Sequence, residues 1–275
     1  MKKNVFLFFV FSLSFFYFGI SQETEDKHPV LADRFQIEIG TFIPSKNIDV
    51  GANGDVPITG TNFGDTFNFN DNEATLFIRL EWYFAKKWKL SVENFSVKAA
   101  KNTTLEEDLV WDNVTFKAGS NVRGGFDMSL YRVFIGRTIS RGLKHELGAG
   151  LGVHALNTGA FIEGNIAINE TDFRFERKKV NGIIPLPNIG FWYNFAPTTK
   201  WLLSTRVDWF GISVDEYSGG LWDLEGKVQY QLFENIGIGV SYVYFSVNAE
   251  VEKSNWNGSF DLTFQGPLFT LSANF

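Results

Sequence analysis

Long stretches of this sequence alternate apolar and polar residues with a period of two, and this pattern limits the fold more than any other. In ATLFIRLEWYF, residues 74–84, every even-numbered residue is apolar, whereas the odd-numbered set includes Arg79 and Glu81. WLLSTRVDW at 201–209 and WDLEGKVQYQL at 222–232 follow a similar rhythm. Successive side chains point to opposite faces in a β-strand, so these segments are predicted strands with one apolar face.

The whole chain can be divided into strands and connections of alternating length. Ten candidate strands cover residues 34–43, 73–85, 87–99, 123–139, 143–156, 183–196, 200–212, 219–233, 235–250 and 258–275. Short turns at 85–87, 140–142, 196–199 and 233–235 alternate with long or polar loops at 44–72, 100–122, 157–182, 213–218 and 251–257. This rhythm is typical of an up-and-down antiparallel barrel that spans an outer membrane. We expect an all-β transmembrane barrel of about ten strands, within a range of eight to twelve.

Two segments leave room for extra structure. Residues 106–116 and 161–175 would form hairpin arms outside the membrane or a further strand pair. An even strand count puts both chain ends on the periplasmic side.

The alternative fold is a soluble β-sandwich or a lipocalin-like barrel, which buries its apolar faces. Aromatic residues make up 17% of the chain, and ten long strands of them would overfill a closed interior. With the faces reversed, aromatic side chains meet lipid while small and charged ones fill the lumen. Aromatic residues near strand ends would then form interfacial girdles; they are Trp82, Phe84, Trp201, Trp209, Trp222, Tyr242 and Tyr244.

The amino end reads as an export signal. Lys2 and Lys3 precede the apolar run at 5–20, and a small residue, Ser21, precedes a polar stretch. The run is about four residues short of the ~20 that a membrane-spanning helix needs, and acidic residues follow it. We therefore expect a signal peptide at 1–21 and a barrel domain at 22–275.

Composition narrows the partners and cofactors. The chain has no cysteine, which excludes a lipoprotein anchor, disulfides and thiolate metal sites. Removal of Lys2 and Lys3 with the leader leaves 23 basic residues against 31 acidic ones, which argues against nucleic acid as a partner. No cofactor or metal ion is expected.

The carboxyl end reads LFTLSANF, with apolar residues on one face of a strand up to the last position. The residues Phe269, Leu271, Ala273 and Phe275 resemble the carboxy-terminal signal of bacterial outer-membrane β-barrels. The resemblance to that broad family covers the leader, the strand rhythm and these last residues. It departs from the OmpA pattern, since no peptidoglycan-binding domain follows Phe275. It implies the outer membrane of a Gram-negative bacterium as the location. Its partners would be outer-membrane lipid, lipopolysaccharide and the barrel-assembly machinery, which reads a terminal aromatic.

Charged residues on the predicted inward faces are the candidate site. They are Arg79, Glu81, Glu93, Arg132, Glu146, His154, Arg206, Asp208, Asp223, Glu225 and Lys227. One interpretation is structural, because buried charges must find partners and a small lumen can be filled by a paired network. The other is a narrow polar path or a lumenal binding site.

A protease or lipid-modifying enzyme is the third class of function. Such sites need a base, an orienting carboxylate and a nucleophile or activated water. Of the three histidines, only His154 lies on an inward face near the external end of a strand. We therefore predict a non-enzymatic barrel with a structural or surface-contact role, no catalytic residue and no metal site. The alternatives are a porin-like small-solute channel and, after it, an enzyme sited in the lumen or the loops.

Overall fold

The computed structural model describes residues 27–54, 58–59, 67, 73–111, 114–167, 173–252 and 256–275. The predicted signal peptide at 1–21 lies outside these residues. Among the described residues, no helix is both long and apolar enough to cross a bilayer.

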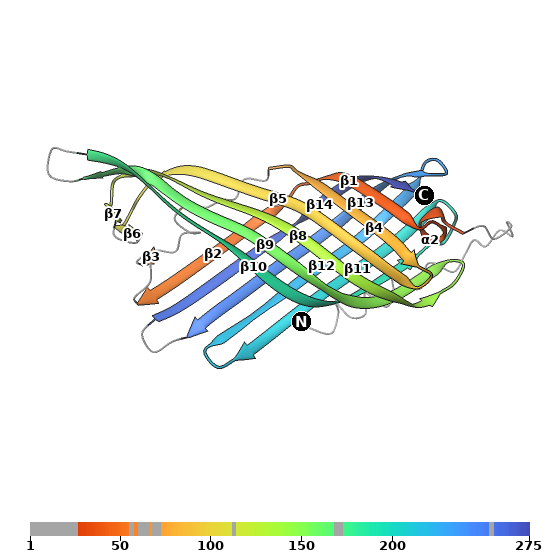
Figure 1. Ribbon diagram of the computed structural model, residues 1–275. Coiled ribbons are helices and arrows are strands. Elements are labelled where there is room, and N and C mark those ends of the chain that lie inside the picture. The colour runs from red at the N-terminus through yellow and green to blue at the C-terminus, as the bar shows by residue number, and fades with distance from the viewer. Residues whose placement is uncertain are drawn as a thin grey trace, which may run out of the picture.

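The described residues form an antiparallel barrel with a short helix at one end (Figure 1). The helix is α2 (Pro29–Ala32). The strands of the main sheet are β1 (Phe35–Phe42), β2 (Ser45–Gly54), β4 (Thr75–Ala85), β5 (Trp88–Thr104), β8 (Asn121–Arg141), β9 (His145–Ala167), β10 (Phe173–Phe195), β11 (Trp201–Val214), β12 (Tyr217–Gln231), β13 (Ile236–Glu252) and β14 (Trp256–Asn274). A second, small sheet contains β3 (Ile58–Thr59), β6 (Leu109–Trp111) and β7 (Val114–Phe116).

The barrel closes because β14 pairs with both ends of the sheet. Residues 268–274 of β14 pair with β1, and residues 256–265 pair with β2. Ile43 and Pro44 separate β1 from β2, so these two strands occupy one position in the ring. The main sheet has 11 strands, and its ring therefore has ten positions, as the strand rhythm predicts.

The barrel has two unlike ends, which we call the terminal end and the extended end. The terminal end holds α2, the last residue and the short turns at 86–87, 142–144, 196–200 and 232–235. At the extended end the β9–β10 hairpin, whose strands have 23 residues each, continues past β8, which has 21 residues and ends level with β5 (Figure 1).

Several predicted loops are strands instead. Residues 45–54 form β2, and most of 157–182 belongs to the β9–β10 hairpin. The loop predicted at 213–218 is a turn at 215–216. On β9 the outward face of the extended segment is polar where it meets water, while Leu156 and Ile162 point inward, and this change of face made the segment look like a loop.

The interior changes character along the barrel axis. In the terminal half it is polar, whereas in the extended half a cluster of buried apolar side chains fills it, including Phe95, Met128, Leu130, Phe245 and Phe264. The small β3–β6–β7 sheet adds Leu109, Trp111 and Phe116 to this cluster. The prediction that small and charged residues fill the whole lumen is therefore wrong for the extended half.

The outer surface of the terminal half is an apolar belt. Its strands expose residues such as Ile78, Ile135, Leu151 and Val240. Exposed Trp82, Trp88 and Trp201 lie near the terminal rim, while Trp209 and Trp222 pair at the other border of the belt, 6.3 Å apart between ring centroids. This arrangement suits a bilayer, with aromatic residues at both interfaces.

The wall opens beside β10. Strand β11 pairs with β10 only along Ile189–Phe195, whereas β9 pairs with β10 along its full length. Pro185 and Pro187 lie just beyond the last pair with β11, where a missing N–H costs no bond to that neighbour. They are therefore residues of an edge segment inside a continuous strand.

Candidate functional site

The charged interior is built on a row of residues that are direct neighbours across five strands. Glu38, Arg79, Glu93, Arg132 and His154 are consecutive partners from β1 to β9. Because directly opposite side chains on one face of a sheet lie within contact distance, a row of alternating sign favours its own neighbours. All five side chains are buried.

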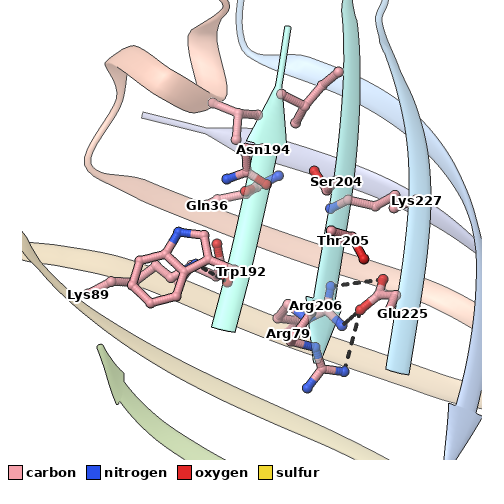
Figure 2. A pocket seen from close by; sticks show the side chains of 13 residues that line it. Gln36, Arg79, Lys89, Trp192, Asn194, Ser204, Thr205, Arg206, Glu225 and Lys227 are labelled. Atoms are coloured by element: carbon pink, nitrogen blue, oxygen red, sulfur yellow. Dashed lines mark hydrogen bonds and ion pairs between the residues drawn. The ribbon is translucent and has the colours of Figure 1, made fainter. Parts of the chain in front are cut away.

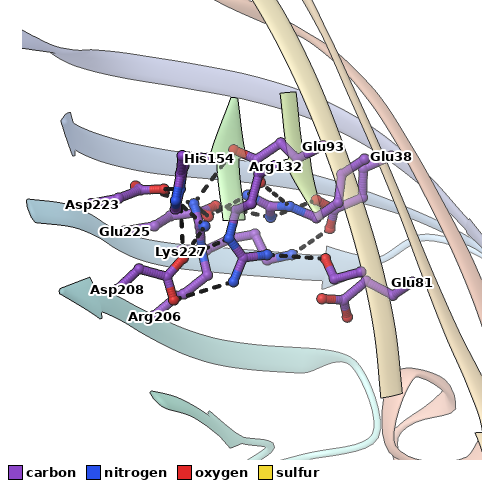
Figure 3. A network of polar contacts seen from close by, with 12 residues as sticks. Glu38, Glu81, Glu93, Arg132, His154, Arg206, Asp208, Asp223, Glu225 and Lys227 are labelled. Atoms are coloured by element: carbon purple, nitrogen blue, oxygen red, sulfur yellow. Dashed lines mark hydrogen bonds and ion pairs between the residues drawn. The ribbon is translucent and has the colours of Figure 1, made fainter. Parts of the chain in front are cut away.

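Strands β11 and β12 supply the facing wall of the lumen. Arg206 pairs in register with Glu225, and Asp208 pairs with Asp223. Lys227 follows Glu225 on the same inward face. The network is drawn in Figure 3, where side chains from the two walls converge in the lumen.

Arg79 connects the two walls. Its guanidinium lies 3.0 Å from Glu38, 2.7 Å from Glu93 and in contact with Glu225. One cation is therefore shared by three carboxylates, each from a different strand. Lys227 also contacts Glu38, which adds a second cation to that carboxylate.

Arg206 is a second junction of the network. It lies 2.9 Å from Asp223, 3.1 Å from Asp208, 3.4 Å from Glu225 and 3.5 Å from Glu93. Arg132 donates to both oxygens of Asp208, its Nη2 at 3.2 Å from Oδ1. Each carboxylate in this part of the lumen thus has a guanidinium against it.

His154 closes the row in a completely buried position. Its Nδ1 lies 3.1 Å from Oδ1 of Asn188, and its Nε2 lies 3.0 Å from Oδ2 of Asp223. Asp208 is 3.8 Å from Nε2. Both ring nitrogens are therefore used by neighbouring side chains, and neither faces open space.

His154, Asp208 and Asp223 are also the one group in the described residues with metal-ligand geometry, their ligand atoms within 4.8 Å of one another. Their carboxylates already accept from Arg132 and Arg206. Two guanidiniums at the same oxygens oppose the entry of a divalent cation. The arrangement is suited to mutual neutralisation of side chains.

Two of the eleven predicted residues lie apart from this network. Glu81 pairs with Lys89 at 3.0 Å. Glu146 accepts from Trp192 Nε1 at 2.9 Å and contacts Tyr83 and Arg141, which forms a separate cluster near the terminal end. The other nine residues meet as described above.

The prediction omitted several interior residues. Glu38 and Lys89 lie on alternating faces of FQIEIGTF and WKLSVE, so the same period-two rule locates them. The prolines around Asn188 obscured the strand alternation that would have placed it in the interior. No signal in the sequence pairs it with His154.

A small cavity of about 40 Å³ lies on the terminal side of the network (Figure 2). Gln36, Lys89 and Trp192 line one part of it, and Ser204 and Arg206 another. A cavity of this size holds a few water molecules.

Helix α2 covers this cavity at the terminal end. Val30 and Leu31 are buried against Ala196 and Leu202. His28 precedes the helix, and its Nδ1 accepts from the backbone N–H of Val30 at 3.2 Å. Burial lowers the pKa of His28 to about 4, so the ring is neutral near pH 7.

The four residues of the predicted assembly signal lie together at the end of β14, with Phe275 directly after its last residue. Phe269, Leu271 and Phe275 are exposed on the outer face, and Ala273 shares that face. They lie where β14 pairs with β1 and β13, at the strand that closes the ring.

By sequence, no family model matches the chain, and neither does any curated protein. Solved structures do match. The outer membrane protease OmpT from Escherichia coli superposes with a TM-score of 0.58 at 12% identity, over 93% of this chain and 100% of that one. The chain has the fold of a bacterial outer-membrane β-barrel. At this identity the likeness concerns the fold alone.

Other outer-membrane barrels align over most of the chain with lower scores. OprG from Pseudomonas aeruginosa has a TM-score of 0.35 at 12% identity, over 92% of this chain and 99% of that one. The toluene transporter TodX from Pseudomonas putida has a TM-score of 0.34 at 6% identity, over 90% and 92%.

Proposed function

We propose that this outer-membrane barrel has a closed interior, no enzymatic activity and a role in surface contact at its extended end. In bacterial barrels the chain termini and short turns face the periplasm and the longer connections face outward. The terminal end would accordingly be periplasmic, and the extended end would project from the cell.

The observation that carries this proposal is that two kinds of side chain, ion-paired and apolar, fill the interior. Ion pairs between both walls occupy the terminal half, and packed aromatic and aliphatic side chains occupy the extended half. A water-filled path through the barrel would have to cross both layers. The cavity of about 40 Å³ lies on the terminal side of both layers, and α2 covers it.

The buried state of His154 supports the absence of catalysis. A general base must reach a proton on its substrate, directly or through one water. Both nitrogens of His154 already face Asn188 and Asp223, beneath Phe245 of the apolar cluster. Protease activity is a property named for OmpT, and among the described interior residues the buried pair of His154 and Asp223 is closed to a substrate.

The test is single-channel recording of the refolded mature protein in a planar bilayer. We expect no discrete current steps from protein whose fold is established by a heat-modifiable gel shift. Regular steps that change in size in Arg206→Gln, and stay unchanged in Arg137→Gln, would replace this proposal with a small-solute channel. Arg137 is a matched control because it is exposed on the outer face of β8 and lies over Trp88.

A further inference from the structure

A second row of charges crosses the barrel wall, on its outer face and far from the lumen. Arg123 on β8, Glu163 on β9 and Arg177 on β10 are direct neighbours in register. Each is an odd-numbered residue of its strand, like the exposed residues Tyr131, Leu151 and Ile189 on the same strands. All three side chains therefore point outward.

One carboxylate holds both arginines. Glu163 lies 3.2 Å from Arg123 through Oε1 and 3.2 Å from Arg177 through Oε2. The ring of Phe161, two residues along β9, lies under both guanidiniums, 4.4 Å from that of Arg177 and 5.9 Å from that of Arg123. Salt bridge and ring together fix the direction of two long side chains that would otherwise be mobile.

The two guanidiniums remain open to an outside ligand. The side chains of Arg123 and Arg177 are 52% and 51% exposed, whereas that of Glu163 is 13% exposed. A guanidinium has five N–H donors in a planar fork, and one carboxylate oxygen uses a fraction of them. Exposed Lys179, opposite Phe161 in the register, brings a third cation to the same face.

The patch is thus three cations around one anion, on a chain whose net charge is −6. Planar guanidiniums held in a fixed direction bind phosphate bidentately and strongly. A positive patch on an acidic protein favours a partner that carries negative charge.

The position along β10 indicates where that anion lies. Outward residues of β10 are apolar from Tyr193 to Ile183, and Lys179 and Arg177 follow four and six residues beyond Ile183. At about 3.3 Å per residue, they are roughly 13–20 Å along the strand beyond Ile183, which lies opposite Asn157 at the border of the belt. On the proposed orientation this distance places them beyond the hydrocarbon, at the level of the sugars and phosphates of the outer leaflet.

We propose that Arg123, Arg177 and Lys179 bind phosphate groups of the phosphorylated glycolipid in the outer leaflet, with Glu163 and Phe161 as positioning residues. This inference rests on the proposed orientation, in which the extended end faces outward. No described residue of β11 pairs with β10 beyond Ile189, so on this side of the patch β10 is the edge of the paired sheet. The glycolipid phosphates would link the β8–β10 wall to the surrounding leaflet.

The test measures binding of purified lipopolysaccharide to the refolded protein in neutral-lipid nanodiscs. Arg123→Gln together with Arg177→Gln is expected to weaken binding roughly tenfold or more, as for the loss of charge-assisted hydrogen bonds. Arg137→Gln is the matched control: it removes an outward arginine from the same strand, also stacked on an aromatic ring, at the terminal end. Lys179→Gln, which leaves both ion pairs of Glu163 in place, is a milder second variant with a smaller expected loss.

Three results would overturn the proposal. One is equal affinity for dephosphorylated lipopolysaccharide, and another is equal loss in the Arg137→Gln control. The third is competition by inorganic phosphate alone at equal molar concentration, since the site would then bind a free anion.

The orientation is checked separately. The chain has no cysteine, so Lys179→Cys gives one label site. Reaction with a membrane-impermeant maleimide on intact cells is expected. Protection there, with binding retained in nanodiscs, would contradict the orientation and leave the phosphate site standing.

Discussion

Strand β8 passes through both halves of the barrel, and its two segments obey opposite rules of burial. From Val122 to Leu130 the even-numbered residues are apolar and buried, and Arg123 and Ser129 point outward. From Tyr131 to Ile135 the odd-numbered residues are apolar and exposed, and buried Arg132 points inward. The apolar set changes face between Leu130 and Tyr131, while the strand itself continues without interruption.

Strands β5, β13 and β14 change face in the same way. On β14, buried Leu262, Phe264 and Leu268 give way to buried Thr270 and Ser272 along one inward face. This change of face shows that the two halves of the barrel meet different solvents on their outer surfaces. Lipid accepts apolar side chains outside and forces the polar ones into the lumen, whereas water requires the conventional apolar core.

The largest effect is expected from breaking the polar interior. Arg79→Ala removes the cation shared by Glu38, Glu93 and Glu225 and leaves buried carboxylates without it. Loss of one partner from a buried ion pair costs about 3–5 kcal/mol of unfolding free energy. Urea unfolding followed by tryptophan fluorescence measures this loss, and Arg137→Ala should stay near wild type. Equal stability of the two variants would show that the network contributes nothing.

The change of face itself can be tested with one substitution at two heights on β9. Leu151 is 67% exposed in the belt, and Asn157 is exposed on the same outward face of the extended half. Leu151→Lys should cost about 2–4 kcal/mol, because a cation there meets hydrocarbon. Asn157→Lys should change stability by less than about 0.5 kcal/mol, since it meets water. Similar losses in lipid vesicles would contradict the assignment of the two halves.

A smaller, pH-dependent effect is expected at the terminal end. With burial lowering its pKa to about 4 from an ordinary 6.5, His28 resists protonation in the docked state. The undocked state therefore binds a proton first, and docking of α2 weakens as the pH falls from about 6.5 towards 4. Amide hydrogen exchange of residues 30–33, corrected for intrinsic rates, should show lower protection at pH 5 than at pH 7.

The control for this effect is His28→Asn, which keeps a capping side chain but does not titrate there. Its protection should be flat over the same pH range. A wild-type profile that is equally flat would remove His28 as the cause.

The smallest effect is expected for an exposed ion pair of the extended half. Lys117 lies 2.6 Å from Asp108, and their side chains are 63% and 44% exposed. The hydrogen bond from Lys117 lowers the pKa of Asp108, but water screens such a pair. Asp108→Asn should leave the urea midpoint unchanged within error. A shift in the urea midpoint as large as that of Arg79→Ala would mean that exposed and buried ion pairs contribute equally to the stability of this protein.

Much of the barrel could be predicted from sequence because a strand has only two faces. The period-two rule assigned Arg132, His154 and Asp223 to the lumen, and all three are buried there. The same rule failed to give the lengths of β9 and β10, since the outer segment of β9 reverses its apolar face and that of β10 is polar on both faces from Glu176 to Lys179, so that both look like loops. Two adjacent apolar residues, as in Leu130–Tyr131, are the sequence sign of that reversal.

By itself the sequence determined the strand segments of the apolar belt and which side of each of them faces outward, because both depend on local alternation and on the solvent outside. Only the tertiary structure decided which charges meet. Arg79 and Glu225 are 146 residues apart, and Arg123 and Arg177 share Glu163 only through the register of three strands. Such partners depend on strand stagger and on closure of the ring, which no single segment of the chain specifies.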